Sequence, residues 1–241
     1  IKVYQEVDST NRAAKAAAVT GEAGHGSFVL AGCQTEGRGR RGRSFYSPQD
    51  AGIYLSVVLE PKGSLQESLL LTAEAAVAVY KAVKKVTGID LDIKWVNDLY
   101  HNGKKVCGIL TEAVTDFESG NIEFAVVGIG LNIFEAAEGY PEAIKGIAGG
   151  IYESREAAGE LERSRLAAEI VNALLEETKE LRLPPEYIEH NIVPGREICI
   201  SDGDKVRSAK ALEICPDGRL KVKEADGSLS VLSYGEVSII I

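Results

Sequence analysis

Short apolar runs rich in β-branched and aromatic residues recur along the chain, separated by polar turns, and predict β-strands. In the first part of the chain we expect them at residues 2–7, 27–34, 52–59, 91–95, 106–114 and 122–131. An Asn-Gly pair and a Ser-Gly pair lie between the last three of these segments, as is typical of hairpin turns. The pattern therefore predicts an antiparallel meander over residues 91–131.

Apolar residues spaced three and four apart predict two long amphipathic helices, at residues 67–86 and 161–181, and a shorter Ala-rich helix is expected at 12–19. From about residue 193 the pattern changes to short strands divided by tight turns, at 201–204, 215–219, 225–228 and 234–236. We therefore predict an α+β domain over residues 1–192, followed by a small β-barrel domain over residues 193–241.

Residues 37–43, between two of the expected core strands, contain four arginines and three glycines. Arginine presents a planar set of charged donors that matches carboxylate or phosphate oxygens two at a time, and glycine lets backbone N–H groups approach a ligand closely. The combination favours a loop that closes over an anion. A disordered Arg/Gly segment that binds nucleic acid is the alternative, and the flanking core strands weaken it.

The charge of the chain narrows the choice of partner. The net charge of −9 argues against binding of bulk nucleic acid or of an anionic membrane, because both need a wide basic face. With 45% hydrophobic residues in 241, the chain can form a full core. The organised positive charge lies in the 37–43 loop and in Lys94, Lys104 and Lys105, which suits one small anionic ligand.

Four separate cysteines without a Cys-x-x-Cys pair, and three histidines without metal-ligand spacing, argue against a disulfide framework and a structural zinc site. No apolar stretch of about 18 residues and no secretion signal is visible in the sequence. We therefore expect a cytoplasmic protein with reduced thiols.

Polar residues and glycines at the strand ends leave several interpretations open. Ser9, Thr10 and Asn11 directly precede the Ala-rich helix and are simplest as a helix cap, although they could also reach a pocket beside the 37–43 loop. Gly128 and Gly130 indicate either a β-bulge or a closely approaching ligand.

The hairpin after residue 95 is predicted to bring Asp98 near Lys105. The spacing of the glycines in the 37–43 loop does not match a P-loop, and the loop joins strand to strand, whereas P-loop and Rossmann motifs join a strand to a helix. An anion-binding loop, a Lys/Asp hairpin and a glycine-rich strand end together suit adenylation of a carboxylate, in which two mutually repelling anions must meet.

Three segments resemble the signatures of biotin protein ligases, also called biotin–[acetyl-CoA-carboxylase] ligases, and occur in that family's order. They are Gly37-Arg38-Gly39-Arg40-Arg41-Gly42-Arg43 with Ser47-Pro48, Lys94-Trp95-Val96-Asn97-Asp98 followed by Lys105-Val106-Cys107-Gly108-Ile109-Leu110, and Gly128-Ile129-Gly130-Leu131-Asn132. The segment 8–11 and Gln34 match the family's biotin-pocket positions, so the resemblance covers nearly the whole chain.

The resemblance implies a catalytic domain of the class II aminoacyl-tRNA synthetase-like/biotin ligase type, with a mixed, mainly antiparallel sheet and flanking helices, and a C-terminal SH3-like β-barrel. It also implies a two-step reaction. Biotin and MgATP give biotinoyl-5′-AMP and pyrophosphate, and a lysine of a biotin carboxyl carrier domain then takes the biotin. The expected ligands are biotin, ATP and Mg²⁺, with no metal-binding residue assigned, and a homodimer through the central sheet is left open.

Carried over by position, the resemblance gives catalytic roles to Lys105, Arg40 and Asp98. It assigns biotin binding to Ser9, Thr10, Asn11, Gln34, Gly37, Arg38, Arg40, Lys105, Gly108 and Leu110. It assigns ATP and adenylate binding to Arg38, Arg40, Arg43, Phe45, Lys105 and Asn132. Lys105 would contact the biotin carboxylate and the α-phosphate, Phe45 would pack on the adenine, and Asp98 would orient or deprotonate the acceptor lysine.

Three departures from the family pattern stand out. Phe45 is found where Trp is usual, and Val96 replaces the Pro of the Lys-Trp-Pro-Asn-Asp motif. The first strand begins near residue 1, so we expect no helix-turn-helix segment and no DNA-binding or repressor function. A lipoate-type protein ligase is the alternative within enzymes, and an Arg/Gly-loop nucleic-acid-binding protein is the alternative outside them.

Overall fold

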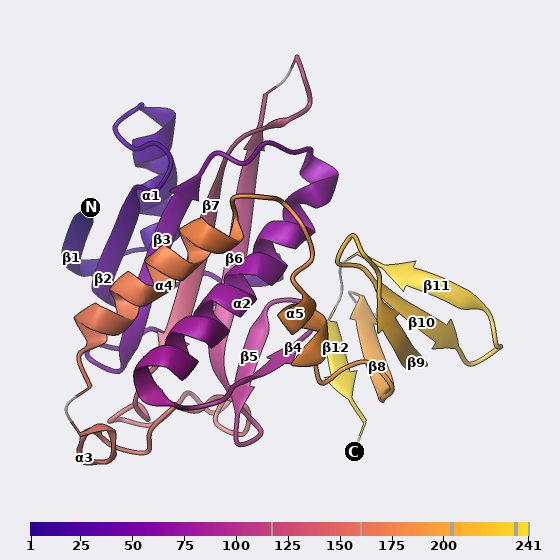
Figure 1. Cartoon of the computed structure of the whole chain (residues 1–241). Helices are drawn as coiled ribbons and strands as arrows, with labels where there is room; N and C mark the ends of the chain where they lie inside the picture. The colour runs from indigo at the N-terminus through magenta and orange to yellow at the C-terminus, as the bar shows by residue number, and fades with distance from the viewer. Residues whose placement is uncertain (117, 160, 203–204, 234–235, 241) are drawn as a thin grey trace.

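A computed structural model describes residues 1–116, 118–159, 161–202, 205–233 and 236–240. Within this part of the chain, the central sheet has seven strands in the order β1-β2-β3-β7-β6-β5-β4 (Figure 1). Their bounds are β1 Lys2–Val7, β2 Phe28–Gln34, β3 Gly52–Leu59, β4 Asp92–Lys94, β5 Asp98–His101, β6 Lys104–Thr115 and β7 Ile122–Asn132. β1 and β2 are parallel and the other neighbours antiparallel, so the sheet is mixed and mainly antiparallel, and the meander is confirmed.

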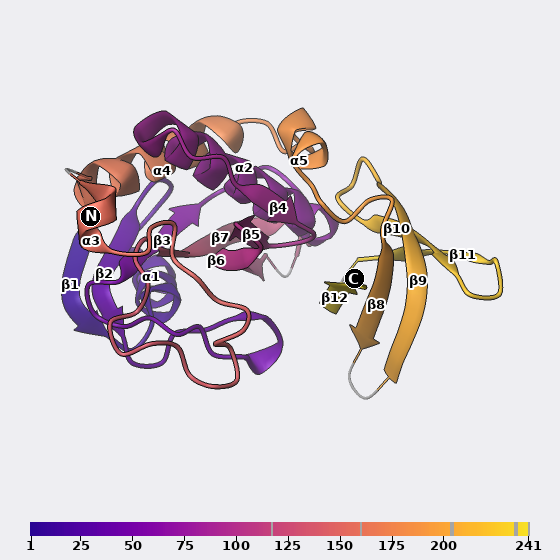
Figure 2. The same cartoon turned by 90° about the horizontal axis from the view of Figure 1, so that it is seen from below.

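Helices cover both faces of the central sheet (Figures 1 and 2). α2 (Ser68–Thr87) and α4 (Arg163–Glu177) pack on one face, and α1 (Thr10–Val19) packs on the other, which we call the α1 face. Two short helices, α3 (Arg155–Ala158) and α5 (Pro185–Glu189), lie before and after α4. β3 is buried along its whole length, which explains its continuous apolar run.

The second long helix is shorter than predicted, because α4 ends at Glu177 and not near residue 181. Beyond it the backbone N–H of Arg182 donates to Glu74 Oε1 (2.9 Å), a carboxylate buried on α2. This bond ties the segment after α4 to α2. Burial raises the pKa of Glu74 to about 8.

Five strands of the described residues form a second, antiparallel sheet in the order β11-β10-β9-β8-β12. Their bounds are β8 Glu197–Asp202, β9 Lys205–Ile214, β10 Leu220–Glu224, β11 Leu229–Leu232 and β12 Glu236–Ile239. No pairing between the edge strands β11 and β12 is found among the described residues, so this sheet is open there and a closed barrel is not confirmed. The turns predicted at 201–204 and 234–236 include positions outside the described residues.

The two sheets share one apolar core. Trp95, which directly follows β4, is buried, and its Nε1 donates to the carbonyl of Gly218 in the turn between β9 and β10 (2.9 Å). Ile198, Val222 and Val237 of the second sheet belong to the same core cluster. Among the described helices, none combines the length and the apolar character needed to cross a bilayer.

Candidate active site

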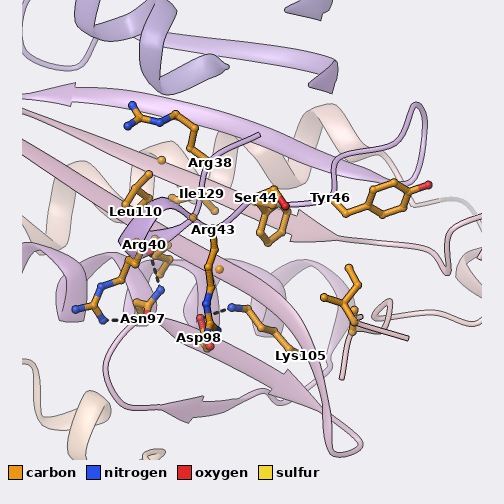
Figure 3. Close-up of a pocket in the computed structure, with 18 of the residues that line it drawn as sticks. Arg38, Arg40, Arg43, Ser44, Tyr46, Asn97, Asp98, Lys105, Leu110 and Ile129 are labelled. Atoms are coloured by element: carbon orange, nitrogen blue, oxygen red, sulfur yellow. Dashed lines mark hydrogen bonds and ion pairs between the residues drawn. The ribbon is translucent and has the colours of Figure 1, made fainter. Parts of the chain in front are cut away.

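A cavity of about 290 Å³ opens on the α1 face of the central sheet (Figure 3). Its walls come from the start of α1, the loop between β2 and β3, strands β4 to β7, the loop after β7, and β12 of the second sheet. Because these segments are far apart in the sequence, only the folded chain assembles the site.

Three glycines on neighbouring strands form the floor of the cavity. Gly108 on β6 pairs with Gly130 on β7, and the ring of Phe45 lies over both, where a Cβ atom on Gly130 would overlap it. Gly128 is covered in the same way by the side-chain amide of Asn11. The register of β7 does not shift at these residues, so the bulge interpretation is wrong. The missing side chains make room for the ring and the amide.

A group of polar, uncharged side chains lies at one end of this floor, and we call it the polar niche. Its members are Ser9, Thr10, Asn11, Gln34, Ser47 and Ser56. Gln34 Oε1 accepts from the backbone N–H and the hydroxyl of Thr10 (2.9 and 3.0 Å), while Gln34 Nε2 donates to Ser47 Oγ (2.8 Å). Hydrogen bonds within the niche therefore join α1 to β2.

Asn11 completes this network. Its Nδ2 donates to Glu112 Oε2 (2.8 Å) and to the carbonyl of Leu110 (3.3 Å), and its Oδ1 lies 2.6 Å from Ser56 Oγ. The helix-cap interpretation is wrong for Thr10 and Asn11. α1 begins at Thr10, the N-cap residue Ser9 makes no side-chain cap bond, and both side chains point into the niche.

The arginine loop, residues 37–43, folds as a short hairpin over the cavity. Gly39 N donates to Arg43 O (2.7 Å) and Phe45 N donates to Gly37 O (2.8 Å). Gly37 is buried in this hairpin, where a Cβ atom would overlap Phe45 O, so it shapes the loop and lies outside the cavity lining. Arg41 has a φ of 57°, which is unusual for a residue with a side chain.

Three arginines of the loop reach three different elements. Their contacts are Arg38 Nη1 to Glu112 Oε1 on β6 (3.2 Å), Arg40 Nη1 to Asn97 Oδ1 before β5 (3.2 Å) and Arg41 Nη1 to Ser201 O on β8 (3.3 Å). Figure 3 shows Arg38 extending away from the Asp98–Lys105 pair, while Arg43 extends toward it. The loop is thus attached to the central sheet and to the second sheet.

Asp98 and Lys105 form an ion pair, with Nζ 2.6 Å from Oδ1, which confirms that the hairpin brings them together. Both side chains line the cavity. Burial lowers the pKa of the nearby Arg40 guanidinium, and the Asp98 charge partly offsets this shift. Arginine stays protonated despite such a shift. Arg40 and Lys105 therefore supply positive charge to the same cavity.

The other end of the floor is formed by Asn132, the last residue of β7, and by the loop after it. Asn132 Nδ2 donates to Gly149 O (3.1 Å), and Lys105 N donates to Ile147 O (2.8 Å), so this loop is tied to β6 and β7. Tyr140 also lines the cavity, and its hydroxyl oxygen is buried without a hydrogen-bond partner among the described residues. A buried hydroxyl of this kind is suited to a polar ligand.

The structure brings nearly all of the site residues predicted from the sequence to this cavity. Those that line it are Ser9, Thr10, Asn11, Gln34, Arg38, Arg40, Arg43, Phe45, Asp98, Lys105, Gly108, Leu110 and Asn132. The sequence did not reveal five further contributors to the site, which are Ser56, Asn97 as a partner of Arg40, Glu112, Tyr140 and Val237. A hydroxyl inside an otherwise apolar strand was the one local signal for Ser56.

Comparison with known proteins connects this geometry to a family. Residues 3–132 match the model of the biotin/lipoate A/B protein ligase family. The chain is 32% identical to the bifunctional ligase/repressor BirA of Bacillus spizizenii, with 96% of this chain and 72% of that protein covered. It is 29% identical to a biotin–[acetyl-CoA-carboxylase] ligase of Mycobacterium tuberculosis, with 98% and 88% covered.

A solved structure agrees along almost the whole chain. The biotin protein ligase of Aquifex aeolicus, in complex with biotin and ATP, superposes with a TM-score of 0.77 at 25% identity and covers 99% of this chain and 97% of that one. The chain therefore belongs to the biotin/lipoate A/B protein ligase family and, within it, to the biotin protein ligases.

Proposed function

We propose that this protein is an ATP-dependent biotin ligase that forms biotinoyl-5′-AMP and transfers biotin to a lysine of a biotin carboxyl carrier domain. The names of the relatives support biotin as the substrate, and the Aquifex complex supports biotin and ATP as ligands. We place the reaction in the cytoplasm, where the four free cysteines stay reduced.

The observation that carries the proposal is the order of groups along β6 and β7. The polar niche lies over Gly128 and Leu110, the Phe45 ring lies over Gly130 and Gly108, and Lys105 and Asn132 follow at the far end. An uncharged site is thus followed by a cationic one in the same cavity. Biotin has the matching order, with an uncharged ureido ring at one end and a carboxylate at the other.

In the first step, the biotin carboxylate would attack the α-phosphorus of ATP, and pyrophosphate would leave. Lys105 and Arg40 would neutralise the negative charge that builds up at phosphorus, which is the largest electrostatic demand of the step. Phe45 would pack on the adenine, Asn132 would bind it, and Tyr140 would bind a polar group of the nucleotide. Arg43, which extends toward the Asp98–Lys105 pair, would bind the adenylate.

In the second step, the amine of the acceptor lysine would attack the acyl carbon of the adenylate, and AMP would leave. The attacking amine must lose a proton, and Asp98 is the carboxylate beside the Lys105 ammonium where that proton can be held. The arginine loop, closed over the cavity, would keep water away from the mixed anhydride.

Mg²⁺ would enter with ATP and neutralise phosphate charge. No group of three or more His, Cys, Asp or Glu side chains suited to a metal is found among the described residues. The described residues are therefore compatible with an ion that is held mainly by phosphates and water, as Mg²⁺ commonly is. We assign no protein ligand to it.

We also propose a division of the chain into a catalytic domain, residues 1–192, and a C-terminal domain, residues 193–241, of the SH3-like barrel type. The change of sheet after α5 supports this boundary. Val237 and Ser238 of β12 line the cavity, so the C-terminal domain would contribute one wall of the active site.

The test is exchange of radiolabelled pyrophosphate into ATP by the purified protein. Exchange should require biotin, and a carrier domain added with unlabelled ATP should then become biotinylated. Exchange that requires lipoate in place of biotin would move the protein to the lipoate ligases. Absence of exchange with either acid, together with salt-sensitive RNA binding, would overturn the proposal.

A further inference from the structure

We propose that Glu112 is a positioning residue that fastens the arginine loop to the polar niche. Glu112 lies on β6, next to the floor of the cavity, and its side chain is only 20% exposed. Its Oε1 accepts from Arg38 of the loop (3.2 Å), and its Oε2 accepts from Asn11 at the start of α1 (2.8 Å). A single carboxylate therefore connects two segments that would bind different parts of the ligand.

The chemistry of this position requires a carboxylate. Both partners donate, so the residue must present two acceptor oxygens and no donor, which only an ionised Asp or Glu does. A glutamine could still accept from Asn11, but its NH₂ group could not accept from the Arg38 guanidinium. An unpaired carboxylate so close to a site for anionic ligands would oppose their binding. The ion pair with Arg38 offsets the negative charge of Glu112.

The Arg38–Glu112 contact also gives the arginines of the loop different roles. With Arg38 turned toward Glu112 and away from the Asp98–Lys105 pair, Arg40, Arg43 and Lys105 are left to meet the charge of the ligand (Figure 3). Asn11 is held by the same carboxylate and by Ser56. A ligand bound in the niche therefore also stabilises the part of the arginine loop around Arg38, because Glu112 bonds both Asn11 and Arg38.

The loop contact can be tested without any ligand, by the rate at which a broad-specificity protease cuts the arginine loop. Glu112→Gln should speed cleavage about three- to fivefold, the range that an ion pair with a half-exposed guanidinium can supply. Glu169→Gln is the matched control. Glu169 is also a partly buried carboxylate in an ion pair, with Lys85 (2.7 Å), but it lies on α4 across the sheet, and its loss should leave loop cleavage unchanged.

A double-mutant cycle separates this contact from a general loss of structure. Arg38→Ala, at a half-exposed side chain, should speed cleavage as Glu112→Gln does, and combining the two should add no further effect. An unchanged cleavage rate in Glu112→Gln, or additive effects of the two substitutions, would overturn the proposal.

The second measurement rests on the proposed function and follows retention of biotinoyl-AMP. Glu112→Gln should release the adenylate about three- to fivefold faster, while Glu169→Gln should match the wild type. If the wild-type protein shows no biotin-dependent exchange, the proposed function fails, and the protease result still decides the role of Glu112. If exchange is normal and Glu112→Gln retains the adenylate as the wild type does, the positioning role fails by itself.

Discussion

The polar niche and the arginine loop border the same cavity but are built differently. Thr10, Asn11 and Ser56 are 3%, 4% and 0% exposed and are bonded to one another and to Gln34. In the loop, the Arg38 side chain is 47% exposed. Three arginines of the loop contact β6, the segment before β5, and β8, at distances of 3.2 or 3.3 Å.

The difference separates recognition of shape from recognition of charge. The buried niche network is ordered when the chain folds, so a ligand that fits it loses little further freedom on binding. The half-exposed Arg38–Glu112 ion pair that fastens the loop is weak, so the loop can adjust its position to a ligand. A neutral ring suits the first arrangement, and a carboxylate or phosphate whose charge changes during reaction suits the second.

The largest effect is expected at Lys105, at the charged end of the cavity. Lys105→Ala should lower biotin-dependent pyrophosphate exchange about 10²- to 10³-fold, because the site loses the charge nearest the reacting groups. Lys104→Ala is the control, since the neighbouring Lys104 Nζ donates to Gly146 O and does not line the cavity. Wild-type exchange in Lys105→Ala would remove Lys105 from the mechanism.

The helix layer beneath both regions should be sensitive to pH through Glu74. Its pKa is raised by burial to about 8, so the unfolded chain gives up this proton at a lower pH than the folded chain. Stability should therefore fall as the pH rises from about 5 to 8 and level off above that range. At about 1.4 kcal/mol per pKa unit, a shift of this size corresponds to a loss of up to about 5 kcal/mol.

Urea unfolding at several pH values checks this expectation. Glu74→Gln should abolish the slope, whereas Glu169→Gln should keep it. A slope that persists in Glu74→Gln would assign it to other groups. Variants of the niche and of the loop are best compared near pH 6, where Glu74 is protonated and the folded chain is more stable.

Two alanine substitutions on one strand test whether the niche is fixed and the loop adaptable. A methyl group at Gly128 would overlap Asn11, which is held by Ser56, Leu110 and Glu112, so Gly128→Ala should reduce the free energy of unfolding by about 1–3 kcal/mol. A methyl group at Gly130 would overlap the Phe45 ring, which belongs to the loop segment and can move. Gly130→Ala should therefore cost less, and equal losses in urea unfolding would contradict the comparison.

The strands and hairpins of the central sheet could be predicted well from the sequence, because their apolar residues and turn residues follow regular patterns. The bounds of β1 and β3 agree with the predicted segments, and the Asn-Gly turn at 102–103 predicted the hairpin that joins Asp98 to Lys105. The cluster of arginines and glycines also showed where the anion-binding loop lies. These features are local, and each can be recognised within about ten residues.

The remaining part of the site depends on long-range placement. Glu112 is one polar residue in a strand, and only the pairing of β6 with β7 and the packing of α1 bring it to Asn11 and Arg38. Tyr140 lies in an irregular loop without a pattern, and Val237 reaches the cavity from the second sheet. The helix-cap interpretation of Thr10 and Asn11 was wrong for a related reason, because distant polar partners outcompeted the local cap.

A smaller effect than at Lys105 is expected in the arginine loop, at Arg40. Arg40→Ala should speed the release of biotinoyl-AMP about tenfold, because the variant loses a partly buried guanidinium that is placed by Asn97 near Asp98. Release can be followed by filter binding of labelled adenylate, with Arg207→Ala in the second sheet as the control. Biotin affinity should change less than release, since the niche stays intact. If Arg40→Ala weakened biotin binding as much as it sped release, niche and loop would act as one unit and the contrast between them would be lost.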